Sequence, residues 1–172
     1  MDRETRLQEK FRNAMRRFAN TVSIVSVQSG AERHGSTATS VTSVSMTLPS
    51  LLICFNQESR LHAFLKKEDR FCVNLLHIAN CDVSEVFSSA VPAAERFASG
   101  RWRYDCGIPY LADAQANLFC SKDQEIIYGS HTIFIGRVTA VHCRDDIAPL
   151  IYRDGAYAFA TDLKEYATSL HA

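Results

Sequence analysis

The sequence predicts a mostly β fold, an antiparallel barrel or sandwich with a few peripheral helices. Segments with strand patterns dominate, and the few segments with helical periodicity lie early in the chain. A doubly wound sheet is not expected, because strands and helices do not alternate along the chain. The chain has 172 residues, about the size of one domain, and contains no internal repeat. We therefore expect residues 1–172 to form a single domain.

The chain begins with a predicted amphipathic helix that stops near Asn20, a residue type that tolerates helix ends. A strand pattern follows at 21–28 (TVSIVSVQ), then a turn at 29–35 (SGAERHG), then a second strand rich in hydroxyl side chains. The apolar side chains that recur at helical spacing in the first segment are Leu7, Phe11, Ala14, Met15 and Phe18.

The middle of the chain alternates short strands and short helices. Pro49 ends the hydroxyl-rich region, since proline cannot donate to a strand ladder, and residues 51–55 (LLICF) form an apolar strand. Ser59 is expected to cap a helix that runs to about Lys67. A strand at 70–76, a short helix at 81–89 and a long, partly irregular connection at 90–109 follow.

Three strand regions complete the chain. They are expected at 114–120 with a continuation to 128, at 131–143, and at 149–159 folded on an Asp154-Gly155 turn. An Asp-Gly pair between two strands is typical of a type I′ hairpin.

Composition excludes several classes of function. Acidic and basic residues balance at 19 each, and no local basic stripe appears, so nucleic-acid binding is not expected. No apolar run is long enough for a membrane span, and the N-terminus lacks a signal-peptide pattern, so we expect a cytoplasmic protein. The six cysteines and the scattered histidines show no metal-ligand spacing, which predicts no metal site and reduced thiols.

Residues 35–57 contain no Asp, Glu, Lys or Arg but many hydroxyl side chains. Such a stretch is too polar for a core strand and unusually neutral for a surface strand. A neutral polar ligand resolves this conflict, and the isoalloxazine ring of a flavin offers carbonyl and ring-nitrogen acceptors that short hydroxyls and backbone amides match. The alternative is an exposed strand and loop that merely happens to be rich in Ser and Thr.

The segment 56–60 lies where a strand gives way to a helix. A helix N-terminus presents free N–H groups and the positive end of its dipole to an anion such as a phosphate. Arg60 would add a charge-assisted hydrogen bond. The alternative is that Arg60 is simply solvated.

Several segments together resemble the flavin reductase family with the FMN-binding split-barrel fold, over nearly the whole chain. They are FRNAMRRFANTVSIVSV, HGSTATSVTSVSMTLPSLLICFN, RFCVNLL, ERFASGRW, GIPYLADAQANLFC, GSHTIFIGRV and PLIYRDGAY, in the family's order and spacing. The resemblance implies a six-stranded antiparallel split barrel that forms a homodimer, with one flavin per subunit near the interface. It favours FMN over FAD as the flavin, and does not separate NADH from NADPH as the donor.

The resemblance also assigns site residues. The isoalloxazine edge would meet Ser36, Thr37, Ala38, Thr39 and Ser40. The ribityl chain or phosphate would contact Ser43, Val44 and Ser45, and the phosphate would approach Asn56, Ser59 and Arg60. His131 would face flavin and nicotinamide as the catalytic residue, and the nicotinamide loop would be Tyr152, Arg153, Asp154 and Gly155.

Two of these assignments have plain structural alternatives. His131 is equally a strand-start histidine after a Gly-Ser turn, and Ser130 stands where many members have an aspartate that would orient the histidine. Arg153 is by default an exposed residue beside a hairpin turn, although a nucleotide phosphate is a suitable partner for it.

The resemblance implies an NAD(P)H-dependent flavin reductase. Hydride would pass from nicotinamide to flavin N5, and reduced flavin would go to a partner monooxygenase. One alternative is the same bound-flavin chemistry with a corrinoid acceptor. Another is a flavin-binding electron carrier or regulator without a nicotinamide site. A pyridoxamine-phosphate type of oxidase has little support, because residues 35–57 lack a basic cluster.

Overall fold

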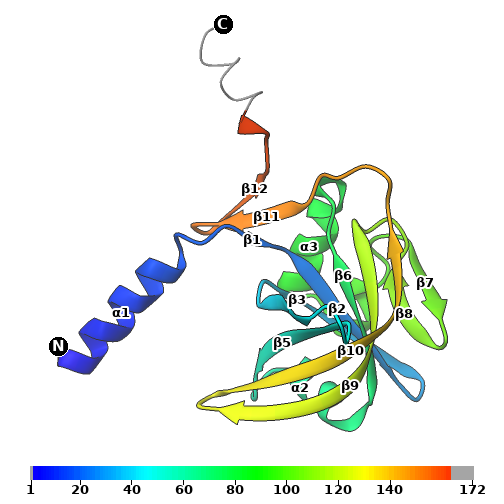
Figure 1. Ribbon diagram of the computed structural model, residues 1–172, viewed down its shortest axis with the longest axis horizontal. Helices are drawn as coiled ribbons and strands as arrows, with labels where there is room; N and C mark the ends of the chain where they lie inside the picture. Colours follow the sequence, from blue (N-terminus) through cyan, green and yellow to red (C-terminus); the bar gives the residue numbers. More distant parts are fainter. Residues whose placement is uncertain (1, 164–172) are drawn as a thin grey trace, which may run out of the picture.

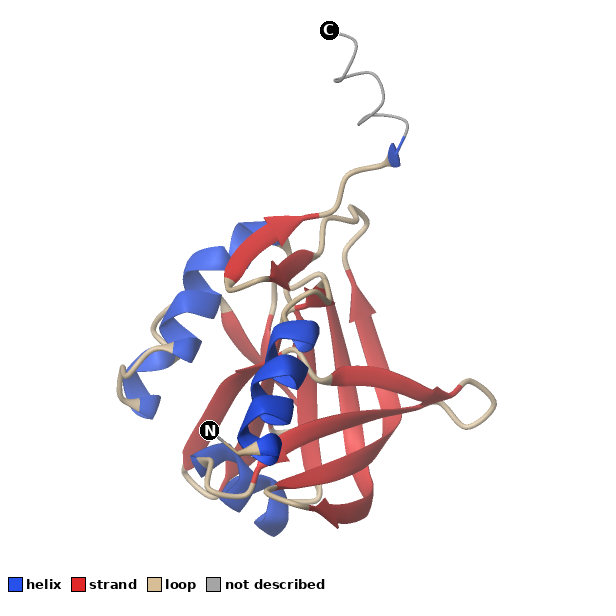
Figure 2. Cartoon of the chain, turned by 90° about the vertical axis from the view of Figure 1, so that its left-hand side faces the viewer, coloured by secondary structure: helices blue, strands red, loops and turns tan. Residues whose placement is uncertain are grey.

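The computed structural model describes residues 2–163, in which strands form a curved barrel and the helices lie outside it (Figures 1 and 2). The strands are β1 (Asn20–Thr21), β2 (Ser23–Ser29), β3 (Glu32–Ala38), β4 (Val41–Ser45), β5 (Ser50–Asn56), β6 (Arg70–Leu75), β7 (Trp102–Asp105), β8 (Ile108–Leu111), β9 (Ala116–Tyr128), β10 (His131–Cys143), β11 (Leu150–Arg153) and β12 (Ala156–Phe159). The helices are α1 (Arg3–Met15), α2 (Arg60–Lys67), the short 3-10 helix η1 (Ile78–Asn80), α3 (Cys81–Ser88) and α4 (Ala93–Arg96).

The main sheet has seven strands in the order β3-β2-β6-β9-β10-β5-β4, and all of its pairs are antiparallel. Its two edge strands, β3 and β4, are consecutive in the chain and are joined by only Thr39 and Ser40. The Ser40 hydroxyl donates to the carbonyl of Cys54 at 2.8 Å, which holds this corner against β5. The sheet therefore curls until its edges meet at the corner without pairing, and this is the split of the barrel.

The predicted fold class is confirmed, with seven strands in the barrel sheet where six were expected. The hydroxyl-rich region is not one strand, because the chain turns sharply at Thr39 and Ser40. The part before the turn belongs to β3 and the part after it to β4, the two edge strands of the main sheet. Two further small sheets, β1-β11-β12 and β7-β8, lie beside the main sheet.

Apolar side chains fill the barrel and the space under its helices. The first cluster includes Val25, Ile53, Phe71 and Phe134 and lies under α2, whose Leu61 and Leu65 are buried. A second cluster joins Leu76 and Phe87 to Phe97 beneath α3 and α4. The rings of Phe97 and Trp102 contact each other edge to face at 4.6 Å, as expected for packing residues.

A buried polar network crosses β2, β6 and β9. The Asn74 amide donates to the Ile24 carbonyl and to the Ser26 hydroxyl, at 2.8 and 2.9 Å. Its carbonyl oxygen accepts from the Asn117 amide and from the Leu111 backbone N–H. Every polar atom of this buried amide is thereby matched, as burial requires.

Three local predictions differ from the structure. The turn expected at 29–35 consists of Gly30 and Ala31 alone, because Gly30 adopts a positive φ of 55° and closes a two-residue hairpin. The connection at 90–109 contains α4 and the β7-β8 hairpin, whose turn residues Cys106 and Gly107 both have positive φ. The first helix ends at Met15, before Phe18 and Asn20.

The helix α1 projects from the barrel as a separate arm (Figure 1). None of its residues is buried, and the side chain of Asp2 caps it by accepting from the Thr5 N–H at 2.7 Å. Within residues 2–163, no helix has the length and apolarity to cross a membrane.

Candidate active site

A cavity of about 560 Å³ lies at the open corner of the barrel, and we call it the Thr37 cavity. The end of β3 supplies one wall, with Thr37 and Ala38 followed by Thr39. The opposite wall comes from the β11-β12 hairpin and from α3. The lining side chains of that opposite wall are Ser84, Glu85, Ser88, Tyr152, Ala156 and Tyr157, with Gly155 at the turn.

Two tyrosines order the hairpin side of this cavity. The Tyr152 and Tyr157 rings contact edge to face with centroids 5.7 Å apart. The Tyr157 hydroxyl shares a 2.8 Å hydrogen bond with the Ser84 hydroxyl of α3. This bond fixes the hairpin against α3, so the two parts of this wall keep a defined position relative to each other.

The β11-β12 turn is held from outside by the end of α1. Asp154 and Gly155 have φ values of 52° and 85°, as a type I′ turn requires, and the predicted hairpin is confirmed. The Arg16 guanidinium donates to the Asp154 carboxylate at 2.9 Å and to its carbonyl at 3.2 Å. The Asp154 N–H donates in turn to the Arg16 carbonyl at 3.0 Å.

On the outer side of the hairpin, Arg153 lines a second cavity together with Arg16 and Arg17.

A separate cavity of about 350 Å³ lies at the start of α2, and we call it the His34 cavity. Its walls come from β3 with His34 and Ser36, from the first residues of α2, and from the segment 90–96. Ser59 caps α2 by accepting from the His62 N–H at 3.2 Å, which confirms the predicted cap. Arg60 lines the cavity, and its side chain has no hydrogen bond or ion pair with another described residue.

The polarity of the two cavities differs. The Thr37 cavity is lined by hydroxyls, two tyrosine rings, small apolar side chains and one carboxylate, that of Glu85. The His34 cavity contains the guanidinium groups of Arg60 and Arg96. Burial and the positive charges of Arg60 and Arg96 lower the pKa of His34 to about 4, so this ring is neutral at physiological pH.

Comparison with known proteins identifies the family. The sequence pattern described as "Flavin reductase like domain" matches residues 15–161. The chain belongs to this family.

Two curated relatives and one solved structure illustrate the likeness. The chain is 40% identical over 156 residues to the "FADH(2)-dependent resorcinol hydroxylase, reductase component" of Rhizobium sp., covering 89% of this chain and 87% of the relative. It is 35% identical over 147 residues to "FMN reductase (NADH) RutF" of Stutzerimonas stutzeri, covering 85% and 84%. The solved structure of the Streptomyces globisporus C-1027 NADH:FAD oxidoreductase SgcE6 "in complex with NAD and FAD fragments" superposes with a TM-score of 0.84 at 29% identity, covering 95% of this chain and 98% of that one.

The flavin reductase fold brings some of the predicted site residues together. Thr37, Ala38 and Thr39 share the Thr37 cavity with Tyr152 and Gly155, although more than one hundred residues separate the two groups in the sequence. The predicted phosphate residues Ser59 and Arg60 share the His34 cavity with Ser36. The predicted flavin residues therefore divide between two neighbouring cavities on either side of β3.

Other predicted residues lie outside both cavities. Val44 is exposed on β4, and Ser43 lies beside it on the same edge strand. The Ser45 hydroxyl accepts from the Leu48 N–H at 3.3 Å within the β4-β5 turn. The Asn56 side chain accepts from the Glu58 N–H at 2.8 Å and shapes the start of the loop before α2.

His131 lies at the first residue of β10, where it pairs with Asn56 of β5 and with Tyr128 of β9. The Ser130 hydroxyl and His131 Nδ1 are 2.9 Å apart, so this serine orients the imidazole ring. The Gln57 amide donates to the Gly129 and His131 carbonyls and fixes the turn. The β9-β10 turn lies far from the β11-β12 hairpin, so one chain does not bring His131 to the Thr37 cavity (Figure 1).

Sequence reasoning missed several residues that line the cavities. Glu85 and Ser88 belong to α3, which the pattern at 81–89 predicts only as a short helix. His34 had been set aside among scattered histidines, although its position two residues before Ser36 on a strand places both on one face. Within residues 2–163, no group of three or more His, Cys, Asp or Glu side chains is placed to hold a metal ion.

Proposed function

We propose that this protein is an NAD(P)H-dependent flavin reductase that supplies reduced flavin to a partner monooxygenase. The observation that carries the proposal is the Thr37 cavity, in which the hydroxyl-rich end of β3 faces the β11-β12 hairpin across one space. Hydride transfer needs a flavin ring and a nicotinamide in contact, and a single cavity with two such walls accommodates a stacked pair.

The residues present suit an isoalloxazine ring. Thr37 lies near the end of β3 and Thr39 just after it, and this edge strand pairs with β2 alone in the main sheet, so its outward amides are available to a ligand. Their hydroxyls and amides match a neutral ring edge without introducing charge. The cationic His34 cavity on the other side of β3 suits the phosphate, with Arg60 and the α2 N-terminus as donors.

The side chains of this protein would have separate roles toward the flavin and the nicotinamide. A bound flavin supplies the hydride acceptor, and the nicotinamide supplies the hydride. Thr37 to Thr39 would orient the ring, while Tyr152 and Gly155 would hold the nicotinamide and exclude water from it. Arg153, with Arg17 beside it, offers positive charge to a phosphate of the donor.

Flavin and donor preferences follow from the relatives. The resorcinol hydroxylase component is named as FADH(2)-dependent and RutF as an FMN reductase using NADH. We propose NADH as the donor and both FMN and FAD as acceptable flavins. The role as one component of a two-component oxygenase rests on the 40% identity to the resorcinol hydroxylase reductase component.

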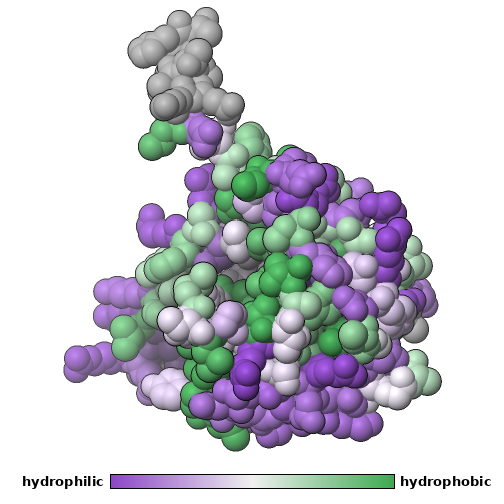
Figure 3. Space-filling model, turned by 45° about the vertical axis from the view of Figure 1, so that its right-hand side comes forward, coloured by the Kyte–Doolittle hydropathy of each residue, from purple (hydrophilic) through white to green (hydrophobic). Residues whose placement is uncertain are grey.

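We further propose that the protein acts as a homodimer. The helix α1 has no buried residue, and a 13-residue helix without tertiary packing is only marginally stable in water. Its apolar side chains are exposed, with Leu7 at 67% and Phe11 at 64% of their full area. Figure 3 shows further apolar side chains at the surface of the barrel, where a second copy would cover them.

An anaerobic stopped-flow experiment tests the proposed activity. The protein is mixed with FMN, FAD or riboflavin and then with NADH or NADPH, and the flavin absorbance is followed. Bleaching of the flavin with catalytic turnover is the expected result. Binding of flavin without bleaching by either nicotinamide would instead identify an electron carrier, and turnover only with an added cob(II)alamin-type acceptor would identify the corrinoid alternative.

A further inference from the structure

His34 occupies an unusual position in the barrel. Its side chain extends from β3, is only 4% exposed, and stacks on the Phe64 ring with centroids 5.0 Å apart. The ring lines the His34 cavity. It also lines a neighbouring cavity between β3 and α2, which Arg60 lines as well. The family assignment gives no role to this histidine.

The lack of hydrogen-bond partners for the His34 ring indicates which of its two nitrogens carries the proton. Nδ1 is buried and has no hydrogen-bond partner, and no described residue bonds to Nε2. A buried N–H without an acceptor costs more than an unused lone pair, because the N–H loses a strong interaction with water. The proton of the neutral ring is therefore assigned to Nε2, which, unlike Nδ1, is not among the fully buried atoms without a partner.

The charged groups around the ring favour an anion in the cavity. Arg60 of α2 and Arg96 of α4 face the ring, and Glu32 and Arg33 of its own strand line the neighbouring cavity. The Arg96 guanidinium is fully engaged, because it donates to four backbone carbonyls of β3, α3 and the loop after α3. Arg33 lies over the Phe97 ring at 4.6 Å. Of the three arginines, only Arg60 has a guanidinium group without a partner among the described residues, so it is available to bind a ligand.

We infer that His34 is a phosphate-binding residue, whose Nε2–H donates to the flavin phosphate held by Arg60 and the N-terminus of α2. This inference rests on the proposed flavin-binding function and adds a recognition residue to it. A neutral imidazole contributes a donor without a further positive charge in a pocket that already holds two guanidinium groups. The role of His34 is thus to distinguish phosphorylated flavins from riboflavin.

Two variants separate this role from a packing role. His34→Phe keeps the stack on Phe64 and removes the donor. We expect it to weaken FMN binding by about tenfold, the usual effect of losing a hydrogen bond to a charged group. Riboflavin, which has the ring and ribityl chain but no phosphate, is expected to bind within about twofold of the wild type. Arg60→Gln serves as the reference variant and should show the same selective loss.

Fluorescence titration of FMN and riboflavin measures these affinities. Equal loss of both ligands in His34→Phe would assign His34 to packing alone and overturn the inference. Unchanged FMN affinity would overturn it as well.

Nitrogen-15 NMR of the imidazole provides a test that does not depend on reductase activity. Before ligand is added, the spectrum should show a neutral ring protonated at Nε2. Both FMN and inorganic phosphate should shift the Nε2 resonance, and riboflavin should not. If the wild type binds no flavin at all, the proposed function fails, and the phosphate titration alone then decides the role of His34. An Nε2 resonance that is unmoved by phosphate and by bound FMN would show that the ring does not contact the anion.

Discussion

At the residue scale, the two cavities separate uncharged from charged recognition. The hydroxyls of Thr37 and Thr39 face a space shared with Tyr152, whereas Arg60 lies in the other cavity beside His34. The strand β3 runs between them and presents alternate side chains to its two faces. A ligand with a neutral ring and an anionic tail matches this division, because each part meets groups of suitable polarity.

Sequence patterns predicted that serine hydroxyls in this region would form hydrogen bonds, but not always with which group. The Ser59 cap was predicted and is confirmed, since a serine before an apolar periodic segment has one common role. The hydroxyls of Ser40 and Ser45 were assigned to the flavin, but in the structure they bond the Cys54 carbonyl and the Leu48 N–H. A hydroxyl serves a ligand or a turn equally well, and only the backbone path between residues 39 and 48 decides which group it reaches.

The role of His131 can be measured with a single substitution. We expect His131→Ala to raise the KM for NADH about three- to tenfold, the effect of one lost hydrogen bond, and to leave the Kd for FMN unchanged. Because His131 lies outside the Thr37 cavity of its own chain, the effect should appear only in the dimer. Steady-state kinetics with NADH and a separate flavin titration provide the two values.

His142→Ala is the matched control, since His142 is also an exposed histidine of β10 but lies at the far end of that strand. Identical kinetics of His131→Ala and the wild type would remove His131 from the mechanism.

At the scale of elements, the β11-β12 hairpin and the end of α1 behave as one unit. Arg16 and Asp154 are joined by three hydrogen bonds that include both backbones. The Asp-Gly pair predicted this hairpin directly, because a type I′ turn needs positive φ at both positions. The β7-β8 hairpin escaped prediction, since its turn is Cys106-Gly107 and cysteine is rarely found at a positive φ. The hydrogen bonds between the end of α1 and the hairpin were not predicted either, because they join residues 138 positions apart in the sequence.

Substitution of Gly155 tests whether this unit serves the donor site. Gly155 has a φ of 85°, and a Cβ there would lie 3.1 Å from the Arg16 guanidinium. We expect Gly155→Ala to lower the free energy of unfolding by about 1 kcal/mol and to raise the KM for NADH, because the hairpin wall of the Thr37 cavity is displaced.

Gly30→Ala is the control, since Gly30 also has a positive φ, of 55°, but has nothing within 4 Å of its Cβ position. It should show a similar loss of stability in denaturant unfolding with unchanged kinetics. Equal KM values for both variants would show that the hairpin geometry does not affect the donor.

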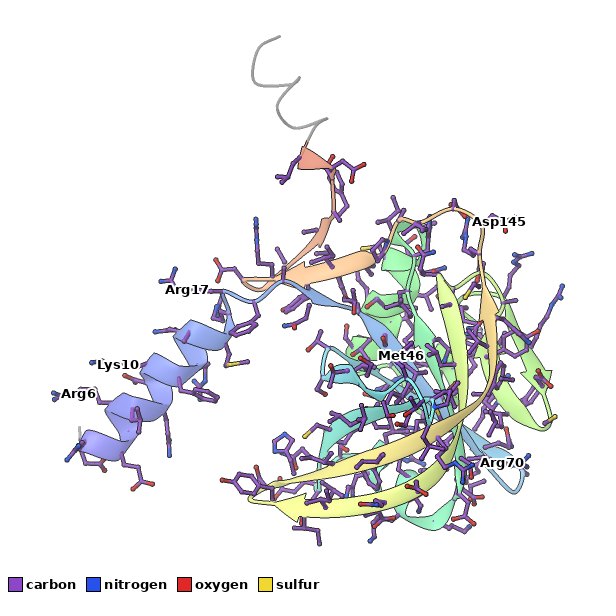
Figure 4. The ribbon with its side chains drawn as sticks, in the orientation of Figure 1. Arg6, Lys10, Arg17, Met46, Arg70 and Asp145 are labelled. Carbon is purple, nitrogen blue, oxygen red and sulfur yellow. The ribbon has the colours of Figure 1, made fainter. Side chains whose placement is uncertain are left out.

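At the scale of the whole molecule, α1 is the element that a single chain does not explain. Arg6 and Lys10 of α1, and Arg17 just after it, point away from the barrel, so this arm presents these charges to solvent (Figure 4). Its apolar residues are equally exposed in one chain, and the proposed second copy is what would cover them. The sequence predicted the amphipathic helix from its periodicity but not its lack of intrachain packing, because periodicity reports that an apolar face exists and not which surface covers it.

Charge substitutions on the two faces of α1 test the homodimer. Phe11→Glu places a carboxylate in the apolar face and should weaken the dimer at least tenfold, since burying an unpaired charge is strongly unfavourable. Arg6→Glu changes the charge by a larger amount on the face that points away from the barrel and should leave the dimer intact. Light scattering coupled to size-exclusion chromatography gives the mass over a concentration series. A monomeric wild type, or a dimer insensitive to Phe11→Glu, would contradict the proposed interface.

The buried, neutral His34 also contributes to the response of the whole fold to acid. Its pKa falls from 6.5 in the unfolded chain to about 4 in the folded protein, chiefly through burial and then through Arg60 and Arg96. Between these values the unfolded chain binds more protons than the folded one, so stability rises with pH across this window and is lost as pH falls from 6.5 toward 4. A shift of this size corresponds to about 3 kcal/mol at most, before solvent screening reduces it. His34→Phe binds no proton at this position in either state. Urea unfolding at pH 7.0 and 4.5 should therefore show a smaller acid loss in His34→Phe than in the wild type, while equal losses would show that His34 titrates normally in the folded protein.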